Sequence, residues 1–394
     1  MSKPLKPPTE SAPRLASLDA YRGFIMFLMA SAGFGIPVVA KKLPDSWWVA
    51  IAPYVDHVPW VGCVLWDLIQ PAFMFMVGVA AAYSTANRLK QGSSTTKVLV
   101  QAAIRAIALT LLGVMLASNS SDEKQTNWLF TNVLAQIGLG YFFLVLLSRV
   151  SFQFQLGALA AILIGYWLLF ALSPIYPIPT GADVTWLNES EWLTGFFAHW
   201  NPHTNAAAEF DRWFLNLFPR PSEYLVTRGG YQTLNFVPSL GTMLMGLMIG
   251  NRLREDSPPK KKLWMLLIVG FGTLAIGWIA GQTICPLVKR IWTPSWTLFS
   301  GGWVILILAL FYYLIDMRNW RTWSIPLAVI GMNSIFVYLG FQLSSGWIRT
   351  TLARHLGPEL FTGPYQAMAE RTGVLLVLWL LAWWLYRQRV FLRL

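Results

Sequence analysis

The chain has 394 residues, of which 55% are hydrophobic and only 12% are charged. Soluble proteins carry about 25% charged residues, so this composition excludes an ordinary soluble domain. The formal charge of +12 would suit a nucleic-acid partner, but that class is excluded when the basic residues lie in short loops on one side of a membrane. We therefore predict an integral protein of the lipid bilayer with no nucleic-acid partner.

Ten segments are mostly apolar and come close to the length of about 20 residues that a membrane span requires. The predicted spans are 21–40, 65–86, 98–118, 129–147, 156–173, 236–251, 263–282, 296–315, 324–343 and 373–386. They predict an all-α polytopic bundle of about ten helices, with a single transmembrane domain over 21–386. Short tails, 1–20 and 387–394, flank it, and the polar, Pro-rich first tail lacks the apolar core of a cleaved signal.

The distribution of basic residues predicts the orientation of these spans. Of the 30 lysines and arginines, 17 fall in alternate loops and tails that together are short: 1–20, 87–97, 148–155, 252–262, 316–323 and 387–394. Loops rich in Lys and Arg stay on the cytoplasmic side. Both termini are therefore predicted to be cytoplasmic.

The longest loop, 174–235, is predicted to be extracytoplasmic and is rich in aromatic residues. It contains the stretch EWLTGFFAHWNPHTNAAAEFDRWFLNLFPR, which is too apolar for a solvated linker. We expect short interfacial helices that cap the bundle and wall a pocket. The alternative is an aromatic belt at the membrane interface that binds no ligand.

Ionisable residues at membrane depth are expensive, and they often mark function. Asp19 and Arg22 share one helix face and can pair, while Asp67 opens the second span near its outer end. Arg105 lies about two turns into the third span, from where it either reaches the inner surface or binds a phosphate. Interhelical hydrogen bonds are the default interpretation for the uncharged polar residues Asn132, Gln136, Asn333 and Ser334.

All four histidines lie in loops predicted to be extracytoplasmic. His57 precedes Asp67 by ten residues, so the two side chains can meet at the outer rim, where an imidazole could move a proton or carry an acyl group. The alternative is a histidine that only hydrogen-bonds its loop. His199 and His203 have the spacing of a metal pair, but Pro202 interrupts the segment and no third ligand is evident, so no metal is predicted.

Several segments, in order, resemble the heparan-α-glucosaminide N-acetyltransferase family of transmembrane acyltransferases, and more closely its bacterial relatives. The segments that carry the resemblance are RLASLDAYRG, HVPWVGCVLWDLIQPAFMFMVG, NVLAQIGLGYF, SLGTMLMGLMIG, KRIWTPSWTLFSGGW and GMNSIFVYLG. The block that begins at His57 is the most specific. The resemblance implies an enzyme of the bacterial inner membrane that moves an acetyl group from cytosolic acetyl-CoA to an extracytoplasmic saccharide.

The resemblance also implies roles for individual residues. His57 matches the active-site histidine of the family, Asp67 the aspartate that follows it, and Arg105 a basic position on the side of the donor. With these we predict a donor site of Arg105, Arg22, Gln136 and Arg88, and an acceptor site of Trp60, His199, Asn201, Asn333 and Ser334.

One departure from the family concerns Gly33, because some relatives carry an asparagine late in the first span. The sequence leaves open whether the acceptor is an amine or a hydroxyl, whether transfer is direct or passes through an acetyl-histidine, and whether the chain forms a homodimer. It also leaves two other classes of function: a transporter, and a glycan-binding membrane protein without catalysis. Cys63 and Cys285 are too few for a disulfide framework, and we expect free thiols.

Overall fold

The computed structural model describes residues 15–121, 123–184 and 191–392. Most of the predicted N-terminal tail, the last two residues and residues 185–190 of the long loop lie outside the described residues. The α-helices are α1 (Ala16–Ser31), α2 (Ile36–Lys42), α3 (Trp48–Ile51), α4 (Ile69–Lys90), α5 (Thr95–Asn119), α6 (Val133–Leu147), α7 (Phe152–Leu172), α8 (Ala206–Leu215), α9 (Phe236–Arg254), α10 (Pro259–Thr283), α11 (Pro294–Phe311), α12 (Ile325–Met332), α13 (Ser334–Leu356) and α14 (Gln366–Arg387). Short 3-10 or π turns are η1 (Ala32–Gly35), η2 (Ala52–Val55), η3 (Leu65–Leu68), η5 (Gly195–Trp200), η6 (Arg228–Gly230), η7 (Thr233–Asn235), η8 (Tyr312–Met317), η9 (Thr322–Ser324) and η10 (Pro358–Phe361).

The prediction of an all-helical membrane bundle is confirmed in outline. Eight helical stretches among the described residues are long and apolar enough to cross a membrane, and a helix pair bent by 67°, α12 with α13, would make a ninth. Large apolar side chains point outward along these helices, as they must where lipid replaces water: Ile104, Ile107 and Leu111 on α5, and Ile268 and Phe271 on α10 are all exposed. The count of ten spans and their orientation stay predictions.

The predicted span 129–147 is shorter in the structure, because only its last 15 residues form a helix. The Asn132 side chain accepts a hydrogen bond from the Ala135 backbone N–H at 3.1 Å, and a side-chain cap of this kind starts a helix. The apolar residues before the cap pack elsewhere, since Phe130 contacts Phe214 and Phe218 outside the bundle. Hydropathy alone therefore placed the start of this helix too early.

The predicted span 324–343 is broken at Asn333, where the chain leaves helical geometry between α12 and α13. The break is stabilised by the C-terminal segment. The Asn333 amide donates to the carbonyl oxygen of Val390 at 3.1 Å and accepts from the backbone N–H of Leu392 at 3.0 Å. A side chain that bonds another segment in this way offers the backbone an alternative to continuing the helix.

Small residues let α4 and α9 approach closely in the centre of the bundle. A Cβ atom added at Gly78 of α4 would lie 1.8 Å from the carbonyl oxygen of Met243 on α9, and one added at Gly246 would lie 2.0 Å from the carbonyl oxygen of Phe75. Glycine at such positions is the usual means by which membrane helices pack tightly. This pairing fixes α4, the helix that follows directly on the turn η3 in which Asp67 lies.

Gly78→Ala is therefore expected to destabilise the bundle, because the backbone of α9 must move to admit one methyl group. Overpacking of this kind costs about 1–3 kcal/mol. Gly272→Ala on α10 is the matched control, since a Cβ there meets nothing within 4 Å. Thermal unfolding of both variants in one detergent should show a lower midpoint for Gly78→Ala alone. Equal midpoints would contradict the close packing.

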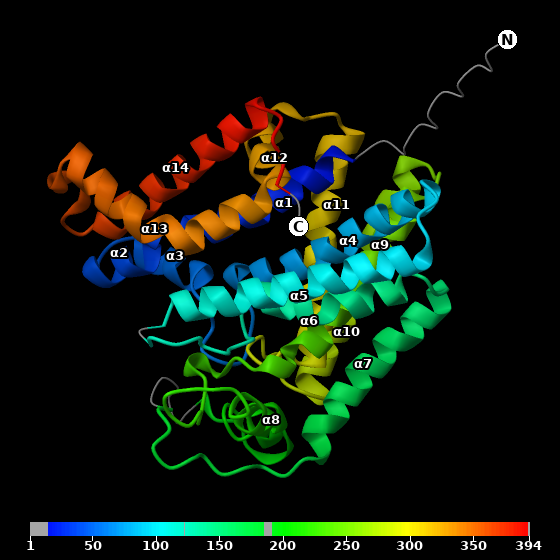
Figure 1. Cartoon of the computed structure of the whole chain (residues 1–394), viewed down its shortest axis with the longest axis horizontal. Helices are drawn as coiled ribbons and strands as arrows, with labels where there is room; N and C mark the ends of the chain where they lie inside the picture. Colours follow the sequence, from blue (N-terminus) through cyan, green and yellow to red (C-terminus); the bar gives the residue numbers. More distant parts are fainter. Residues whose placement is uncertain (1–14, 122, 185–190, 393–394) are drawn as a thin grey trace.

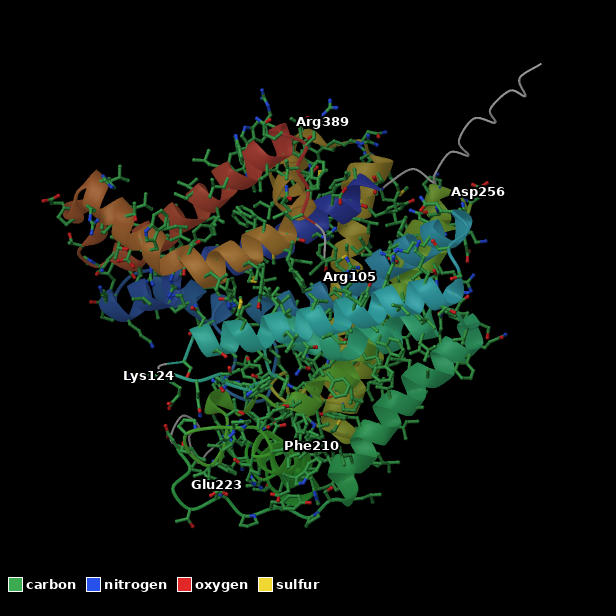
Figure 2. The ribbon with its side chains drawn as sticks, in the orientation of Figure 1. Arg105, Lys124, Phe210, Glu223, Asp256 and Arg389 are labelled. Atoms are coloured by element: carbon green, nitrogen blue, oxygen red, sulfur yellow. The ribbon has the colours of Figure 1, made fainter. Side chains whose placement is uncertain are left out.

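Predicted inner and outer loops lie at opposite ends of the molecule. Figure 2 shows Asp256 and Arg389, from predicted cytoplasmic loops, at one end and Lys124 and Glu223 at the other, with Arg105 between them. The second end carries a layer formed by residues 120, 121, 123–132, 174–184 and 191–235, which we call the cap layer and which contains α8 (Figure 1). The structure thus separates the two groups of loops that the charge distribution assigned to different sides.

A buried acid inside the cap layer predicts a pH-dependent stability. Asp211 on α8 is fully buried, and this burial raises the pKa of its carboxyl to about 7. A hydrogen bond from the Thr233 backbone N–H lowers the same pKa but does not offset the effect of burial. Between the ordinary carboxyl pKa near 4 and 7, the folded protein keeps a proton that the unfolded chain loses. The free energy of unfolding therefore falls as pH rises through this window and is flat above it.

Asp211→Asn should remove that dependence because the amide does not titrate. We expect thermal unfolding of the wild type to lose more stability between pH 5 and pH 8 than that of the variant. An identical loss in both proteins would show that the Asp211 carboxyl does not retain its proton.

Candidate active site

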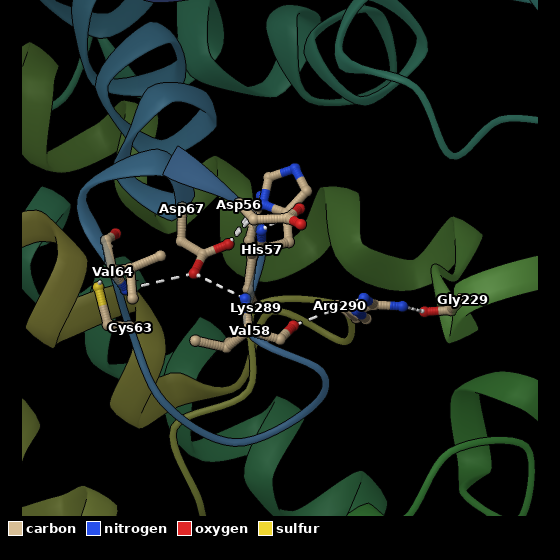
Figure 3. Close-up of polar contacts among 9 residues, drawn as sticks. All are labelled: Asp56, His57, Val58, Cys63, Val64, Asp67, Gly229, Lys289 and Arg290. Atoms are coloured by element: carbon tan, nitrogen blue, oxygen red, sulfur yellow. Dashed lines mark hydrogen bonds and ion pairs between the residues drawn. The ribbon is translucent and has the colours of Figure 1, made fainter. Parts of the chain in front are cut away.

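His57, Asp67 and Lys289 form a polar cluster at one end of the bundle. The Nδ1 atom of His57 lies 2.7 Å from Oδ1 of Asp67, and Nζ of Lys289 lies 3.3 Å from the same oxygen and 3.1 Å from Nδ1 (Figure 3). The Asp67 and Lys289 side chains are buried, whereas that of His57 is 38% exposed. The predicted contact between His57 and Asp67 is therefore present in the structure.

The local sequence explains how Asp67 is held. Asp67 lies in the turn η3 that opens α4, and its Oδ2 accepts the backbone N–H of Val64 at 3.3 Å and that of Val58 at 3.5 Å. The chain between these residues turns at Gly62, whose φ of +122° suits glycine. The carboxylate thereby fixes both ends of the loop that presents His57.

The same loop is tied to the segment that brings Lys289. The Gly62 backbone N–H donates to the carbonyl oxygen of Leu287 at 2.9 Å, and Val61 and Val288 form an isolated β-bridge. These backbone contacts place Lys289, 222 residues along the chain, against Asp67. The site is therefore assembled from two loops that meet at the end of the bundle.

The geometry selects one tautomer of His57. With Nδ1–H donating to the Asp67 carboxylate, Nδ1 has no lone pair for the Lys289 ammonium, so Lys289 bonds the carboxylate instead. Nε2 is then the free acceptor. It has no hydrogen-bond partner in the part of the chain that the structure describes, and the ring is partly open to solvent. A carboxylate that orients an imidazole with an open Nε2 is the arrangement of acyl-transfer bases.

Lys289 was not predicted from the sequence. It belongs to the quoted segment KRIWTPSWTLFSGGW, and the available signal was a basic residue among apolar ones in a loop assigned to the outside. A solvated loop lysine gives the same signal, and only the fold shows that Lys289 is 4% exposed.

Neither cysteine is suited to act as the acyl carrier. Both are free. Cys63 lies near the cluster, but burial and the Asp67 charge together raise the pKa of its thiol to about 12, and burial also raises that of Cys285. The thiolate is the nucleophilic form, so these thiols are inert at neutral pH. His57 is therefore the candidate reactive group of the cluster.

A cavity of about 270 Å³ lies inside the bundle between α1, α4, α5, α6 and the break between α12 and α13. Its polar lining brings together Arg22, Arg105 and Ser334. Arg22 Nη2 donates to the Ser334 hydroxyl at 2.8 Å, and Arg105 Nη1 donates to the Tyr141 hydroxyl at 2.8 Å. The rest of the lining is mostly apolar: Ile25, Phe73, Met76, Val77, Ala80, Ala81, Leu109, Leu134, Ile137, Met332, Ile335, Phe391 and Leu392.

The cavity runs along the helix that begins at the polar cluster. Its α4 lining extends from Ser84 to Phe73, and Phe73 follows Asp67 by six residues. At a rise of 1.5 Å per residue, about 9 Å of helix separates the end of the cavity from the Asp67 backbone. One helix therefore connects a cavity containing two arginines to the His57 cluster.

Other predicted donor-site residues lie apart from this cavity. The Gln136 amide is buried and donates to the carbonyl oxygens of Phe130, Gln232 and Thr233. Arg88 lies near the end of α4 and is not part of the cavity lining. Of the four residues predicted to hold the donor, the structure brings together Arg22 and Arg105.

The predicted acceptor-site residues are dispersed. Trp60 is buried and its Nε1–H donates to the carbonyl oxygen of Trp200 at 3.0 Å, while Asn201 bonds both backbone groups of Leu193. The His199 ring contacts Trp200 and Phe196. His199 and Asn201 belong to the cap layer, and Trp60 contacts this layer from the loop that follows His57. Asn333 holds the C-terminal segment instead, and Ser334 lines the cavity.

Gly33, the position at which some relatives carry an asparagine, lies close to the loop that presents His57. Gly33 lies in the kink η1 with a φ of +64°, and an added Cβ would lie 3.0 Å from the carbonyl oxygen of Val55. Val55 precedes His57 by two residues. An asparagine, which tolerates positive φ, would therefore project beside the loop that presents the histidine.

Apolar helices around a cavity, with an oriented histidine at one end, define a polytopic helical membrane protein with an enzyme-like polar site. Among curated proteins, the chain is similar to the heparan-alpha-glucosaminide N-acetyltransferases of Homo sapiens and Mus musculus. It is 23% identical to them over 369 and 372 residues, covering 84% of this chain and 53% and 54% of theirs. No protein-family model matches. The chain is distantly related to these transferases, and it spans about half of their length.

Proposed function

We propose that the protein is a transmembrane acetyltransferase that uses acetyl-CoA from one side of the membrane and an acceptor on the other. The observation that carries the proposal is the oriented His57–Asp67 pair at the start of α4, whose next turns line a cavity containing Arg22 and Arg105. The distant transferase relatives support the same chemistry. The acceptor is an amine or hydroxyl of an extracytoplasmic saccharide.

The cavity fits the donor by its chemistry. Two guanidinium groups offer charge-assisted hydrogen bonds to phosphate oxygens, and the mostly apolar walls suit the extended arm that carries the thioester. Arg22 and Arg105 hold the nucleotide end in this arrangement, and the acyl end points along α4 toward His57.

His57 supplies the proton transfer. In direct transfer, the acceptor nitrogen or oxygen attacks the thioester carbonyl, Nε2 takes its proton, the C–S bond breaks, and the CoA thiolate leaves. In the two-step alternative, Nε2 itself attacks the carbonyl and forms a C–N bond while the C–S bond breaks and the CoA thiolate leaves. The acceptor then attacks the acetyl-imidazole, the C–N bond breaks, and the proton of the acceptor passes to the released Nε2. In either route, Asp67 holds Nδ1–H and stabilises the positive charge that forms on the ring.

The proposed topology follows from the two separated ends of the molecule. The basic loops near Asp256 and Arg389 face the cytoplasm, and the cap layer faces outward, so that both termini are cytoplasmic (Figure 2). We assign the protein to the bacterial inner membrane. Labelling of a cysteine introduced at exposed Ser222 only from the cytoplasmic side would overturn this orientation.

Vesicles that contain the purified protein test the activity. We expect label from acetyl-CoA on the cytoplasmic face to appear on glucosamine or a related sugar on the opposite face, and only when the protein is present. A transporter would move a solute without consuming thioester, and a glycan-binding protein would consume none. Absence of both thioester loss and acetylated sugar, across amine and hydroxyl acceptors, would refute the proposal.

Arg105→Ala is expected to weaken acetyl-CoA binding by about ten- to a hundredfold, because a hydrogen bond to a charged group contributes about 1.5–3 kcal/mol. Tyr141→Phe is the matched control, since it removes the hydroxyl to which Arg105 donates and leaves the guanidinium charge. Titration calorimetry with CoA measures both. Unchanged affinity in a folded Arg105→Ala protein would remove Arg105 from the donor site.

A further inference from the structure

A second cavity lies in the cap layer, outside the bundle and apart from the cavity assigned to the donor. Its volume is about 350 Å³, and three separate segments line it: 123 and 125–128, 181–183, and 220–226. A volume of this size is within the range of ligand-binding clefts. Figure 2 shows Glu223, from the third segment, at the same end of the molecule as Lys124, which does not line the cavity but lies between two residues of the first segment in the sequence.

The charge of this groove is opposite to that of the chain. The protein has 30 basic and 18 acidic residues, yet the charged side chains that line the groove are three acids, Glu123, Asp183 and Glu223, against one base, Arg220. Glu123 and Glu223 are exposed at its edge. A cationic ligand is therefore favoured, and an anionic one is repelled.

Two aromatic rings and the arginine form the inner wall. Arg220 donates to the carbonyl oxygen of Trp128 at 3.3 Å, and its guanidinium lies 5.3 Å from the centre of the Tyr224 ring. Phe218 stacks on Trp128 from one side at 5.2 Å. The two rings are thus held in place by protein contacts, and they present preorganised apolar surface beside the hydrogen-bonding groups Gln125, Thr126, Asn127 and Ser222.

We propose that this groove holds an amino-sugar chain, with its ammonium groups against Glu123 and Glu223 and its ring faces against Trp128 and Tyr224. Sugars combine apolar ring faces with many hydroxyl donors and acceptors, which the aromatic and amide lining matches. The acids select chains with free amines. The inference rests on the proposed function, because it assigns the groove to retention of the acceptor chain while the His57 cluster performs transfer.

The direct test uses the whole protein in nanodiscs and two probes of equal length, a glucosamine tetramer and its fully N-acetylated counterpart. The variant Glu123→Gln/Glu223→Gln removes the two edge charges. The matched control Asp45→Asn/Glu359→Gln removes two exposed acids of other predicted outer loops. Titration calorimetry at low ionic strength measures binding, and acetyl transfer to the tetramer and to monomeric glucosamine is assayed alongside.

We expect the glucosamine tetramer to bind the wild type and the control equally, and the groove variant at least about tenfold more weakly. The N-acetylated tetramer should bind the wild type at least about tenfold more weakly as well. KM for the tetramer should rise in the groove variant, with KM for acetyl-CoA and the rate with monomeric glucosamine unchanged.

The outcomes separate the two proposals. Equal binding of the glucosamine tetramer by wild type and groove variant, or equal binding of both tetramers by the wild type, would overturn the groove assignment and leave acetyl transfer untouched. Selective tetramer binding without any transfer would keep the groove and refute the acetyltransferase.

Discussion

Replacing His57 by alanine should abolish acetyl transfer while leaving acetyl-CoA binding nearly intact. Removal of a positioned base costs about 10²–10⁴-fold in rate, and removal of an acyl carrier would eliminate the two-step route. The donor site is spared because Arg22 and Arg105 lie around the bundle cavity and not at the His57 loop. On one folded preparation of His57→Ala, the transfer rate should therefore fall while the affinity for CoA stays close to that of the wild type.

His355→Ala is the matched control, since His355 is an exposed histidine near the end of α13. It should retain the rate of the wild type. If His57→Ala transfers acetyl groups within a few-fold of wild type, then His57 only hydrogen-bonds its loop and the proposed chemistry is wrong. Mass spectrometry after acetyl-CoA is added without acceptor distinguishes the two routes, because only the two-step route leaves an acetyl group on His57.

The contact between His57 and Asp67 could be predicted because both residues lie on one short loop. Ten residues that include Pro59 and Gly62 can fold back only in a few ways, and a carboxylate at the start of a helix commonly accepts nearby backbone N–H groups. Lys289 could not be predicted in the same way. Its approach depends on the backbone pairing of Gly62 with Leu287, which no local pattern in the sequence encodes.

The number and lengths of the spans were harder to predict than their existence. Hydropathy counts apolar residues, but it does not show which polar side chain ends a helix. Asn132 caps α6 by accepting the Ala135 backbone N–H, so the helix starts later than hydropathy predicts. Asn333 separates α12 from α13 and hydrogen-bonds the C-terminal segment. Both residues had been interpreted as interhelical hydrogen-bonding groups. For Asn132 this is confirmed, because its amide also donates to the carbonyl oxygen of Gly113 on α5 at 2.7 Å, whereas Asn333 bonds the segment that follows α14.

The cavity that we propose for the donor shows the same limit. Arg22, Arg105, Gln136 and Arg88 had all been assigned to it from their types and approximate depth, yet the structure brings only the first two to the cavity. Gln136 has the same burial and polarity that a ligand-binding residue would have, but its partners are backbone carbonyls of the cap layer. The residue type alone does not show which groups a side chain hydrogen-bonds, because the fold determines those partners.

Lys289→Met is expected to lower the free energy of unfolding by about 3–5 kcal/mol, because it leaves the buried Asp67 carboxylate without its ammonium partner. Asp67→Asn should also destabilise the protein, since it leaves the buried Lys289 charge without its carboxylate. The double variant Lys289→Met/Asp67→Asn contains neither charge. It should therefore be more stable than Lys289→Met. The interaction energy between the two substitutions should be well above the deviation from additivity of about 0.3–0.5 kcal/mol that independent sites show.

Among the wild type, the two single variants and the double variant, the transfer rate should not recover where stability recovers. This difference between activity and stability defines the role of Lys289. The double variant regains stability, but an asparagine at position 67 cannot stabilise the imidazolium as a carboxylate does, so transfer stays low while CoA affinity is retained. Denaturant unfolding and transfer rates on the four proteins measure both quantities. Additive losses of stability would show that the two charges do not interact, and recovery of transfer in the double variant would show that the Asp67 carboxylate is not needed to orient His57.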